Sequence, residues 1–151
     1  MEIRPISEQE AKEIKDWAYP PPYDFYNMNG EGELHGYEVI YENGHLVGFF
    51  CTGEEARVPA GYGAGAYPEE EGIIDIGLGM NPERADRGGG MAFLSFILDH
   101  LRTTRSPASF RLTVADFNER AIRLYRKAGF RESGAFSREN TRFLVMVKKE
   151  I

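Results

Sequence analysis

Apolar residues recur along this chain with the spacings of short strands and helices. Residues 37–42 and 45–52 are rich in β-branched and aromatic residues, and Asn43-Gly44 between them is a dipeptide typical of two-residue hairpin turns. Residues 73–80 predict a further strand, because their side chains alternate between two faces. One face carries Ile74, Ile76, Leu78 and Met80, and the other carries Ile73, Asp75, Gly77 and Gly79.

Three segments have the apolar spacing of amphipathic helices. The first, residues 8–17, follows a serine that is a favourable N-cap. The second is predicted over about residues 89–103. Its apolar side consists of Phe93, Phe96, Ile97, His100 and Leu101. The third follows Asp116 and Glu119, which are spaced as a capping box, and it ends before Gly129, a favourable left-handed C-cap.

The remaining strands are predicted at residues 2–6, 109–115, 130–136 and 142–148. The resulting order, β-α-β-β-β-α-β-α-β-β, predicts an α/β fold with a mixed sheet flanked by helices. Consecutive prolines prevent residues 19–26 from continuing the first helix, so this segment is predicted to be an ordered aromatic loop. Residues 53–72 are predicted to form a second long loop, rich in Gly and Glu, and the length of its Gly-rich part, residues 59–72, is compatible with a lid.

Length and composition limit the protein to a few classes. With 151 residues, 42% of them hydrophobic, the chain suits a single domain over residues 1–151 with a substantial core. No apolar run approaches the length of a membrane span, and the N-terminus lacks the basic and apolar regions of a signal peptide. The single cysteine, Cys51, excludes an intrachain disulfide framework. We therefore expect a cytoplasmic protein.

The net charge of the chain argues against nucleic acid as a partner, and the charged residues are unevenly distributed along the sequence. The net charge of −6 argues against a protein that binds nucleic acid through phosphate contacts. Residues 1–75 carry 4 Lys/Arg and 16 Asp/Glu, whereas residues 76–151 carry 14 and 8. This distribution fits either a chance scatter of surface charge or a bipolar molecule. In the second case the C-terminal half meets an anion and the N-terminal half attracts a cation.

Gly88-Gly89-Gly90 lies between a predicted strand and a predicted helix, with Arg87 beside it. Glycines at this place leave backbone N–H groups uncovered at a helix N-terminus, which suits a phosphate or pyrophosphate. A tight turn that needs only glycine flexibility is the alternative. A Walker loop is excluded because Gly-Lys-Ser/Thr is absent, and a Rossmann fingerprint is disfavoured because the glycines lie past mid-chain.

The most specific stretch runs from Leu112 to Phe130 and reads L-x-V-x-x-x-N-x-x-A-x-x-L-Y-x-K-x-G-F. Taken with MNPERADRGGGMAFL before it, this stretch resembles the GNAT superfamily of acyl-CoA-dependent N-acyltransferases. The resemblance covers residues 72–135 by motif and the whole chain by element order. It implies a GNAT-like mixed, mostly antiparallel sheet flanked by helices. One register of the turn departs from the family's Q/R-x-x-G-x-G/A pattern by placing Ala85 first, and a second register, which begins at Arg87, satisfies it.

The resemblance implies acetyl-CoA as the cosubstrate. Family members bind the CoA pyrophosphate on backbone amides of the glycine turn and pair the pantetheine arm with the strand before it. Further contacts come from the helix that carries the second motif. Carried onto this sequence, the implied cofactor-binding residues are Leu78, Met80, Arg87, Gly88, Gly89, Gly90, Met91, Asn118, Ala121 and Tyr125. Of these, Tyr125 would lie near the CoA sulfur.

Acyl transfer to an amine needs an acid for the departing thiolate, and Tyr125 is the candidate. A thiol has a pKa of about 8.5 and a phenol a pKa of about 10, so a tyrosine can donate a proton to the sulfur and recover it. Asp75 is the candidate base, because Gly77 and Gly79 leave its face of the strand bare. Three alternatives stay open: Tyr125 as a half-buried aromatic, Asn118 as a helix cap, and Asp75 as an ammonium contact or the partner of an arginine.

The resemblance also implies that the acceptor amine binds near the aromatic loop. Tyr19, Tyr23 and Tyr26 would line an apolar or cation-binding pocket, or else would be core residues packed on the sheet. No metal is expected, because the three histidines lack metal-ligand spacing. Cys51 is interpreted as buried packing rather than as a nucleophile. We therefore expect direct attack of the amine in a ternary complex.

The sequence predicts an N-acetyltransferase acting on a primary amine of a small cationic molecule or a peptide. One alternative is a non-catalytic acyl-CoA-binding module that keeps the glycine turn. Another is an enzyme of the same fold that acts on a protein N-terminus or an aminoglycoside. No nucleic-acid or membrane partner is expected. A homodimer is a further expectation, because the final strands of small sheets often pair across subunits.

Overall fold

The structure is a computed structural model that describes residues 1–34, 36–85 and 87–150. The chain divides into two compact units, each treated separately below. The N-terminal unit comprises Met1–Cys51 and Leu78–Ala92, and the C-terminal unit comprises Thr52–Gly77 and Phe93–Ile151. A single domain over the whole chain stays a prediction.

The described residues follow the predicted order with one addition, a short α-helix at Ala60–Gly63 inside the segment predicted to be a loop. The strands are β1 Glu2–Pro5, β2 Glu38–Glu42, β3 His45–Thr52, β4 Ile73–Met80, β5 Ser109–Ala115, β6 Arg131–Arg138 and β7 Thr141–Lys149. The α-helices are α1 Glu8–Lys15, α2 Ala60–Gly63, α3 Gly90–Arg105 and α4 Glu119–Ala128. Short 3₁₀ helices span Tyr23–Tyr26 and Gly53–Ala56. Each predicted strand is found with ends shifted by at most 2 residues.

The strands pair in the order β1-β2-β3-β4-β5-β7-β6. β4 and β5 are parallel over Ile73–Asp75 and Ser109–Arg111, whereas the described pairs β1–β2, β2–β3, β5–β7 and β6–β7 are antiparallel. The mixed, mostly antiparallel sheet is therefore confirmed. The register of β4 with β5 ends at Asp75, although β4 itself continues to Met80.

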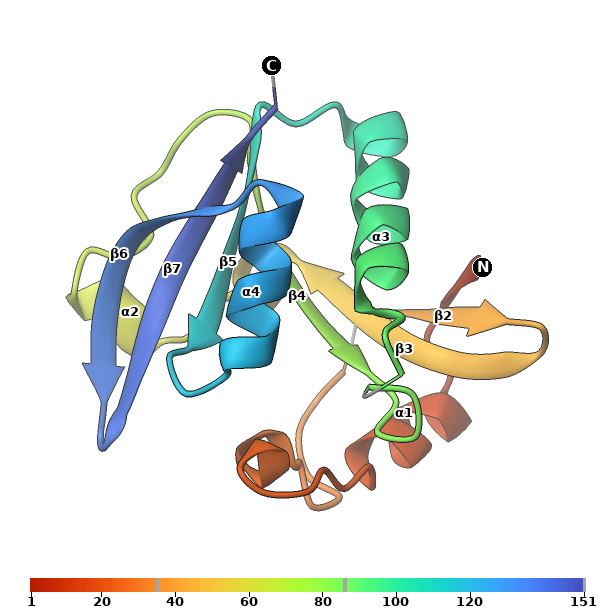
Figure 1. The fold of residues 1–151 in the computed structure, drawn as a ribbon. Coiled ribbons are helices and arrows are strands. Elements are labelled where there is room, and N and C mark those ends of the chain that lie inside the picture. The colour runs from red at the N-terminus through yellow and green to blue at the C-terminus, as the bar shows by residue number, and fades with distance from the viewer. Residues whose placement is uncertain (35, 86, 151) are drawn as a thin grey trace. The chain divides into compact units, whose positions relative to one another are not determined.

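In the N-terminal unit, β1, β2 and β3 form an antiparallel meander (Figure 1). The hairpin turn places Asn43 and Gly44 in the left-handed region, with φ of 52° and 78°, as a two-residue turn of this kind requires. The predicted N-cap of α1 is present and is completed by Glu10 as a capping box. One buried cluster of this unit consists of Ile14, Leu34, Val39 and Leu46.

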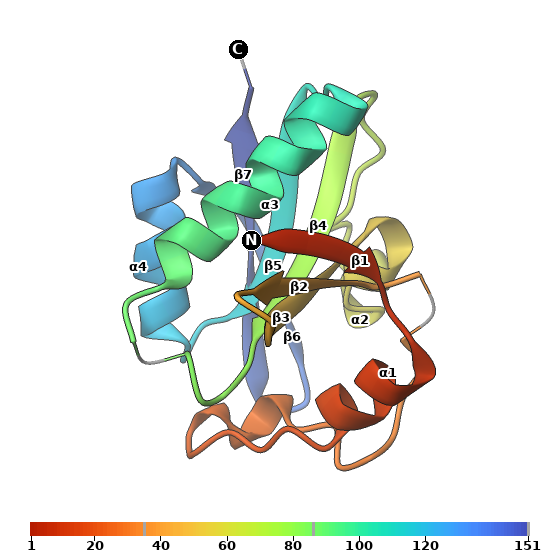
Figure 2. The ribbon, with the colours of Figure 1, turned by 90° about the vertical axis from the view of Figure 1, so that its right-hand side faces the viewer.

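In the C-terminal unit, α4 covers one face of β5, β7 and β6, and α2 lies on the opposite face (Figures 1 and 2). On the α4 side, Ile122 and Tyr125 are buried. The helix ends at Gly129, whose φ of 106° supplies the predicted left-handed C-cap, and Phe130 after it is fully buried. The core on the α2 side consists of Tyr67, Ala115, Phe136, Phe143 and Val145.

Two details of the predicted helices are corrected. The cap of α4 is Asn118, whose side-chain oxygen accepts the N–H of Ala121 at 3.2 Å, rather than Asp116. The helix starts later than the capping-box spacing suggested, so Asp116 precedes the capping position. The buried residues of α3 are Phe93, Leu94, Ile97, Leu98 and Leu101. Phe96 and His100, predicted on this face, are only half-buried. Leu94 and Leu98 take their places on the buried face.

Candidate functional site

The turn from β4 to α3 is built around Asn81. Its backbone N–H donates to the carbonyl of Val47 at 2.8 Å, and its side-chain amide donates to the carbonyl of Leu46 at 3.1 Å. Its own carbonyl accepts the backbone N–H groups of Arg84 and Ala85. These bonds fasten the end of β4 to β3 and fix where the chain leaves the strand.

The glycine turn leads directly into α3. Gly88 has a φ of 75°, which favours glycine, and an added Cβ there would meet no described atom within 4 Å. A Cβ on Gly89 would meet Met80 Cε at 3.8 Å, an ordinary contact. α3 begins at Gly90, and the first N–H groups of a helix have no partner within it. Arg87 is exposed beside the turn. The structure thus leaves open space at the glycine turn before α3, and phosphate binding there stays a prediction.

The residues predicted on α4 share one face of that helix. Asn118 caps it, Ala121 is half-buried, and Tyr125 is 9% exposed. The Tyr125 ring packs edge-to-face on Phe130, with ring centroids 6.0 Å apart. Asn118 thus does act as a cap, one of the alternatives left open by the sequence. The contacts of Asn118 and Tyr125 with a cofactor stay predictions.

The three tyrosines predicted to line the acceptor pocket differ in their surroundings. Tyr19 is half-buried, and its hydroxyl donates to the backbone carbonyl of Met80 at 2.6 Å. Tyr23 is half-buried at the start of its 3₁₀ helix. Tyr26 is 37% exposed and packs edge-to-face on Phe25. Tyr19 is thus bonded to the end of β4, whereas Phe25 and Tyr26 lie at the surface.

An aromatic cluster not singled out by the sequence patterns packs against the same end of β4. Phe49 of β3 stacks on Tyr37 with centroids 5.7 Å apart, and its centroid lies 6.1 Å from that of Trp17. A Cβ on Gly79 would come within 2.5 Å of the Phe49 ring, so the close approach requires glycine. The pairing of β3 with β4 creates this contact, and no local signal in either strand could have revealed it.

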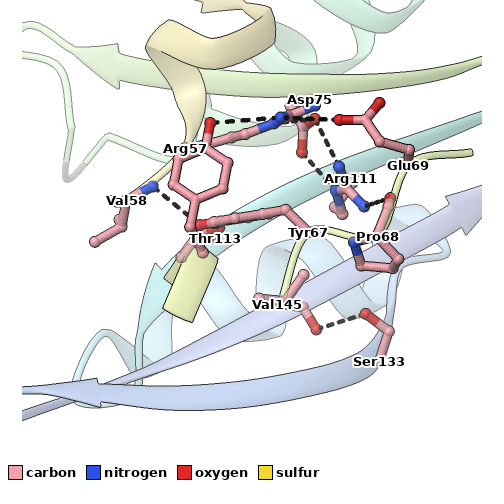
Figure 3. Close-up of polar contacts among 11 residues, drawn as sticks. Arg57, Val58, Tyr67, Pro68, Glu69, Asp75, Arg111, Thr113, Ser133 and Val145 are labelled. Carbon is pink, nitrogen blue, oxygen red and sulfur yellow. Dashed lines mark hydrogen bonds and ion pairs between the residues drawn. The ribbon is translucent and has the colours of Figure 1, made fainter. Parts of the chain in front are cut away.

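Asp75 lies in a buried ion-pair cluster of the C-terminal unit (Figure 3). Arg111 of β5 donates Nε to Oδ1 at 2.6 Å and Nη2 to Oδ2 at 2.9 Å. Arg57 donates Nε to Oδ2 at 2.9 Å. Asp75 and Arg111 are 3% and 2% exposed, so both carboxylate oxygens accept guanidinium hydrogens away from solvent. The geometry matches the alternative of pairing with an arginine, and the role of Asp75 as a base stays a prediction.

The connection between β3 and β4 supplies further partners of this cluster. Arg111 Nη1 donates to the carbonyl of Pro68 at 3.0 Å, and Arg57 Nη1 donates to the Tyr62 hydroxyl at 3.4 Å. The hydrogen bonds to Tyr62 and Asp75 raise the pKa of Arg57 above its ordinary value. Sequence reasoning missed both arginines. Arg111 did carry a signal, because a lone charge inside an apolar strand requires a buried partner.

Tyr67 joins the cluster to the sheet. Its hydroxyl lies 2.6 Å from Thr113 Oγ1 and accepts the backbone N–H of Val58 at 3.0 Å (Figure 3). Its ring centroid is 5.7 Å from the guanidinium carbon of Arg57 and 5.3 Å from that of Arg111. These contacts fasten residues 57–68 to β4 and β5, which favours a fixed connection over a lid.

The model of the acetyltransferase (GNAT) family matches residues 3–130, a range that includes β4, the glycine turn and α4. This chain belongs to the acetyltransferase (GNAT) family.

A curated relative of this GNAT protein is mycothiol acetyltransferase from Acidimicrobium ferrooxidans, which is 38% identical over 95 residues. The match covers 63% of this chain and 27% of the relative, so the chain spans about a quarter of the relative's length.

Two solved structures resemble the GNAT chain along nearly its whole length. A mutant of spermidine N-acetyltransferase SpeG from Vibrio cholerae has a TM-score of 0.66 at 17% identity, covering 99% of this chain and 95% of its own. AAC(6′)-Ib in complex with ribostamycin and coenzyme A has a TM-score of 0.73 at 16% identity, covering 98% and 92%. At these identities the likeness shows the fold alone.

Three further features of the described residues concern metal ligands, the single cysteine and membrane-spanning helices. Among the described residues, no group of three or more His, Cys, Asp or Glu could hold a metal ion, and His35 lies outside them. Cys51 is buried and is not part of a disulfide. None of the described helices is both long and apolar enough to cross a membrane.

Proposed function

We propose that this protein is an N-acetyltransferase that moves the acetyl group of acetyl-CoA to a primary amine by direct attack in a ternary complex. The observation that carries the proposal is the family match over residues 3–130, which includes a glycine turn with a left-handed Gly88 and open space around it. The positive φ of Gly88 also fits the alternative of a turn that needs only glycine flexibility, and the family match is what favours the cofactor site.

In this proposal the pyrophosphate of acetyl-CoA binds the backbone amides of Gly88–Gly90, with Arg87 and Met91 beside them. Leu78 and Met80 offer backbone groups to the pantetheine arm. This role is supported by the pairing of β4 with β5, which ends at Asp75, before either residue. Asn118, Ala121 and Tyr125 contact the arm from α4. The fixed donors of the turn suit an anion, because they need no reorganisation on binding.

Tyr125 acts as the acid in this proposal and protonates the departing CoA thiolate. The burial of Tyr125 on α4 supports this role. A phenol that is shielded from water transfers its proton to the bound ligand rather than to solvent. The amine attacks the thioester carbonyl, whose oxygen is polarised by backbone N–H groups near Leu78–Met80. The C–S bond then breaks, and the proton that the nitrogen loses restores the Tyr125 phenol. Asp75 as base is less well supported, because both its oxygens already bind guanidinium groups.

The proposed acceptor is a primary amine on a small cationic molecule or a peptide. Residues 1–75 carry 16 Asp/Glu against 4 Lys/Arg, which attracts cations. The aromatic loop with Tyr19, Tyr23 and Tyr26 would contribute to the acceptor site. Similar proteins are named for spermidine and aminoglycoside acetylation, and both of these acceptors are polyamines. A cytoplasmic location, a homodimer and the absence of nucleic-acid or membrane partners stay predictions.

The test is calorimetric titration of the purified protein with acetyl-CoA, with NADH as the control ligand. Saturable binding of acetyl-CoA alone is expected, and spermidine and aminoglycosides are then screened by release of free CoA. Binding with no CoA release from any amine would favour a non-catalytic acyl-CoA-binding module. Failure to bind acetyl-CoA would contradict the proposal.

A further inference from the structure

The aromatic loop, residues 19–26, is closed by hydrogen bonds. The backbone N–H of Tyr19 donates to Oδ1 of Asn27, the residue after the loop, at 2.8 Å. Within it, the N–H of Tyr23 donates to the carbonyl of Pro20 at 2.8 Å, and the N–H of Asn27 donates to the carbonyl of Asp24 at 3.0 Å. Because its ends and its middle are linked, we expect the loop to move as one body.

One side chain of this loop is bonded to the last residue of β4. The Tyr19 hydroxyl donates to the Met80 carbonyl at 2.6 Å. That carbonyl belongs to the same peptide unit as the N–H of Asn81, which donates to Val47 on β3 at 2.8 Å. A peptide unit is rigid and planar, so a restraint on its carbonyl group also restrains its N–H group. The loop and the sheet are therefore connected through one peptide.

A second contact lies close to the first. Trp17, two residues before Tyr19, packs near Phe49, and the Phe49 ring lies against Gly79, the residue before Met80. The segment that enters the aromatic loop is thus linked to Gly79 through the Phe49 ring and to Met80 through the Tyr19 hydrogen bond.

We infer that Tyr19 is a positioning residue that makes the aromatic loop respond to acetyl-CoA. The inference rests on the proposed function, in which the backbone of Leu78 and Met80 holds the pantetheine arm. A bound arm restrains the Met80 peptide, and the Tyr19 hydrogen bond passes this restraint to the loop that lines the acceptor site. Linkage is reciprocal, so an amine that holds the loop strengthens acetyl-CoA binding by the same factor. One neutral hydrogen bond limits this factor to about tenfold.

Trp17 is the only tryptophan in the chain and reports on the loop. The test measures acrylamide quenching of Trp17 fluorescence with and without saturating acetyl-CoA, and calorimetry measures acetyl-CoA binding on the same samples. Tyr19→Phe removes the hydroxyl and keeps the ring. Tyr41→Phe is the matched control, because the Tyr41 hydroxyl bonds to Glu10 elsewhere in the same unit.

In the wild type and in Tyr41→Phe, acetyl-CoA is expected to lower Trp17 quenching. Tyr19→Phe is expected to show greater quenching without ligand, to bind acetyl-CoA within about tenfold of the wild-type affinity, and to lose at least about half of the ligand-induced change. If Trp17 quenching in Tyr19→Phe, and its change on acetyl-CoA binding, equal those of the wild type, the inference is overturned and the proposed function is not affected. Absence of calorimetric binding to the wild type would overturn the proposed function and, with it, the inference.

Discussion

Arg111 binds both carboxylate oxygens of Asp75, and the pair is almost completely buried. Arg57 adds a second guanidinium to the same carboxylate, so two cations share one anion in the interior. Removal of one charge from a buried pair leaves the other uncompensated, which costs more than the pair contributes. Asp75 is therefore expected to act first as the electrostatic anchor between β4, β5 and the connection before β4.

Asp75→Asn tests this expectation. Loss of the carboxylate leaves Arg57 and Arg111 without their buried counter-charge, so the free energy of unfolding should fall by about 3–5 kcal/mol in urea denaturation. The pH profile of kcat/KM of the remaining folded enzyme should keep its acidic limb. Glu69→Gln is the control, because Glu69 is an exposed partner of the same Arg57 and should matter little. Unchanged stability with a lost acidic limb would instead support a catalytic base.

Gly89→Ala tests the glycine turn without disturbing the free protein. The added methyl meets Met80 Cε at 3.8 Å and the residue has no positive φ, so folding should be unaffected. The methyl would keep a pyrophosphate from the backbone donors, and the Kd for acetyl-CoA should rise about tenfold to a hundredfold in calorimetry. Gly134→Ala, at an equally open position, is the control for folding and affinity. An unchanged Kd in Gly89→Ala would refute the pyrophosphate site.

Tyr125→Phe separates chemistry from packing. Phenylalanine keeps the edge-to-face contact with Phe130, so the melting temperature should change little. Loss of the acid should lower kcat about a hundredfold while the Kd for acetyl-CoA stays unchanged. The control is Tyr41→Phe, which loses a hydrogen-bonded phenol outside the proposed site. Wild-type turnover in Tyr125→Phe would remove the acid role from this residue.

The stabilising contribution of Glu150 is expected to depend on pH. The hydrogen bond from Arg102, with a further one from Lys148, lowers the pKa of Glu150 below its ordinary value of 4.5. Its stabilising contribution is therefore present above pH 4.5 and is lost as the pH falls through the lowered folded-state pKa. The melting temperature of Glu150→Gln should lie below that of the wild type at neutral pH, and the gap should close in acid.

The same substitution at the exposed Glu54 controls for the loss of one negative charge. A gap between wild type and Glu150→Gln that stayed constant from neutral pH into acid would contradict the assignment of this stabilisation to the ionised carboxylate.

Most of the fold was predictable from the sequence because its signals are local. Asn43-Gly44 turns the hairpin since both residues tolerate a left-handed backbone, and Gly129 ends α4 for the same reason. Strand alternation located β4 and β5 with the bounds that the structure has. The glycine turn was also a local pattern, which is why its position before α3 could be predicted.

The same reasoning placed the candidate residues but not their partners. It singled out Asp75 by residue type and strand face, and Tyr19 through the resemblance to the family. It did not find Arg57, which lies in a loop without periodicity. It also assigned the cap of α4 to Asp116, because the spacing of a capping box does not show which of two neighbouring polar residues adopts the capping conformation.

By itself, the sequence determined the order of the elements, the hairpin and helix ends, and the resemblance to the family. Tertiary structure alone decided that Arg57 and Arg111 bind Asp75, that Phe49 lies on Gly79, and that Tyr19 bonds to Met80. The physical reason is that each of these contacts joins residues far apart in the chain. They depend on strand order and register, whereas periodicity and turn chemistry describe only neighbours along the chain.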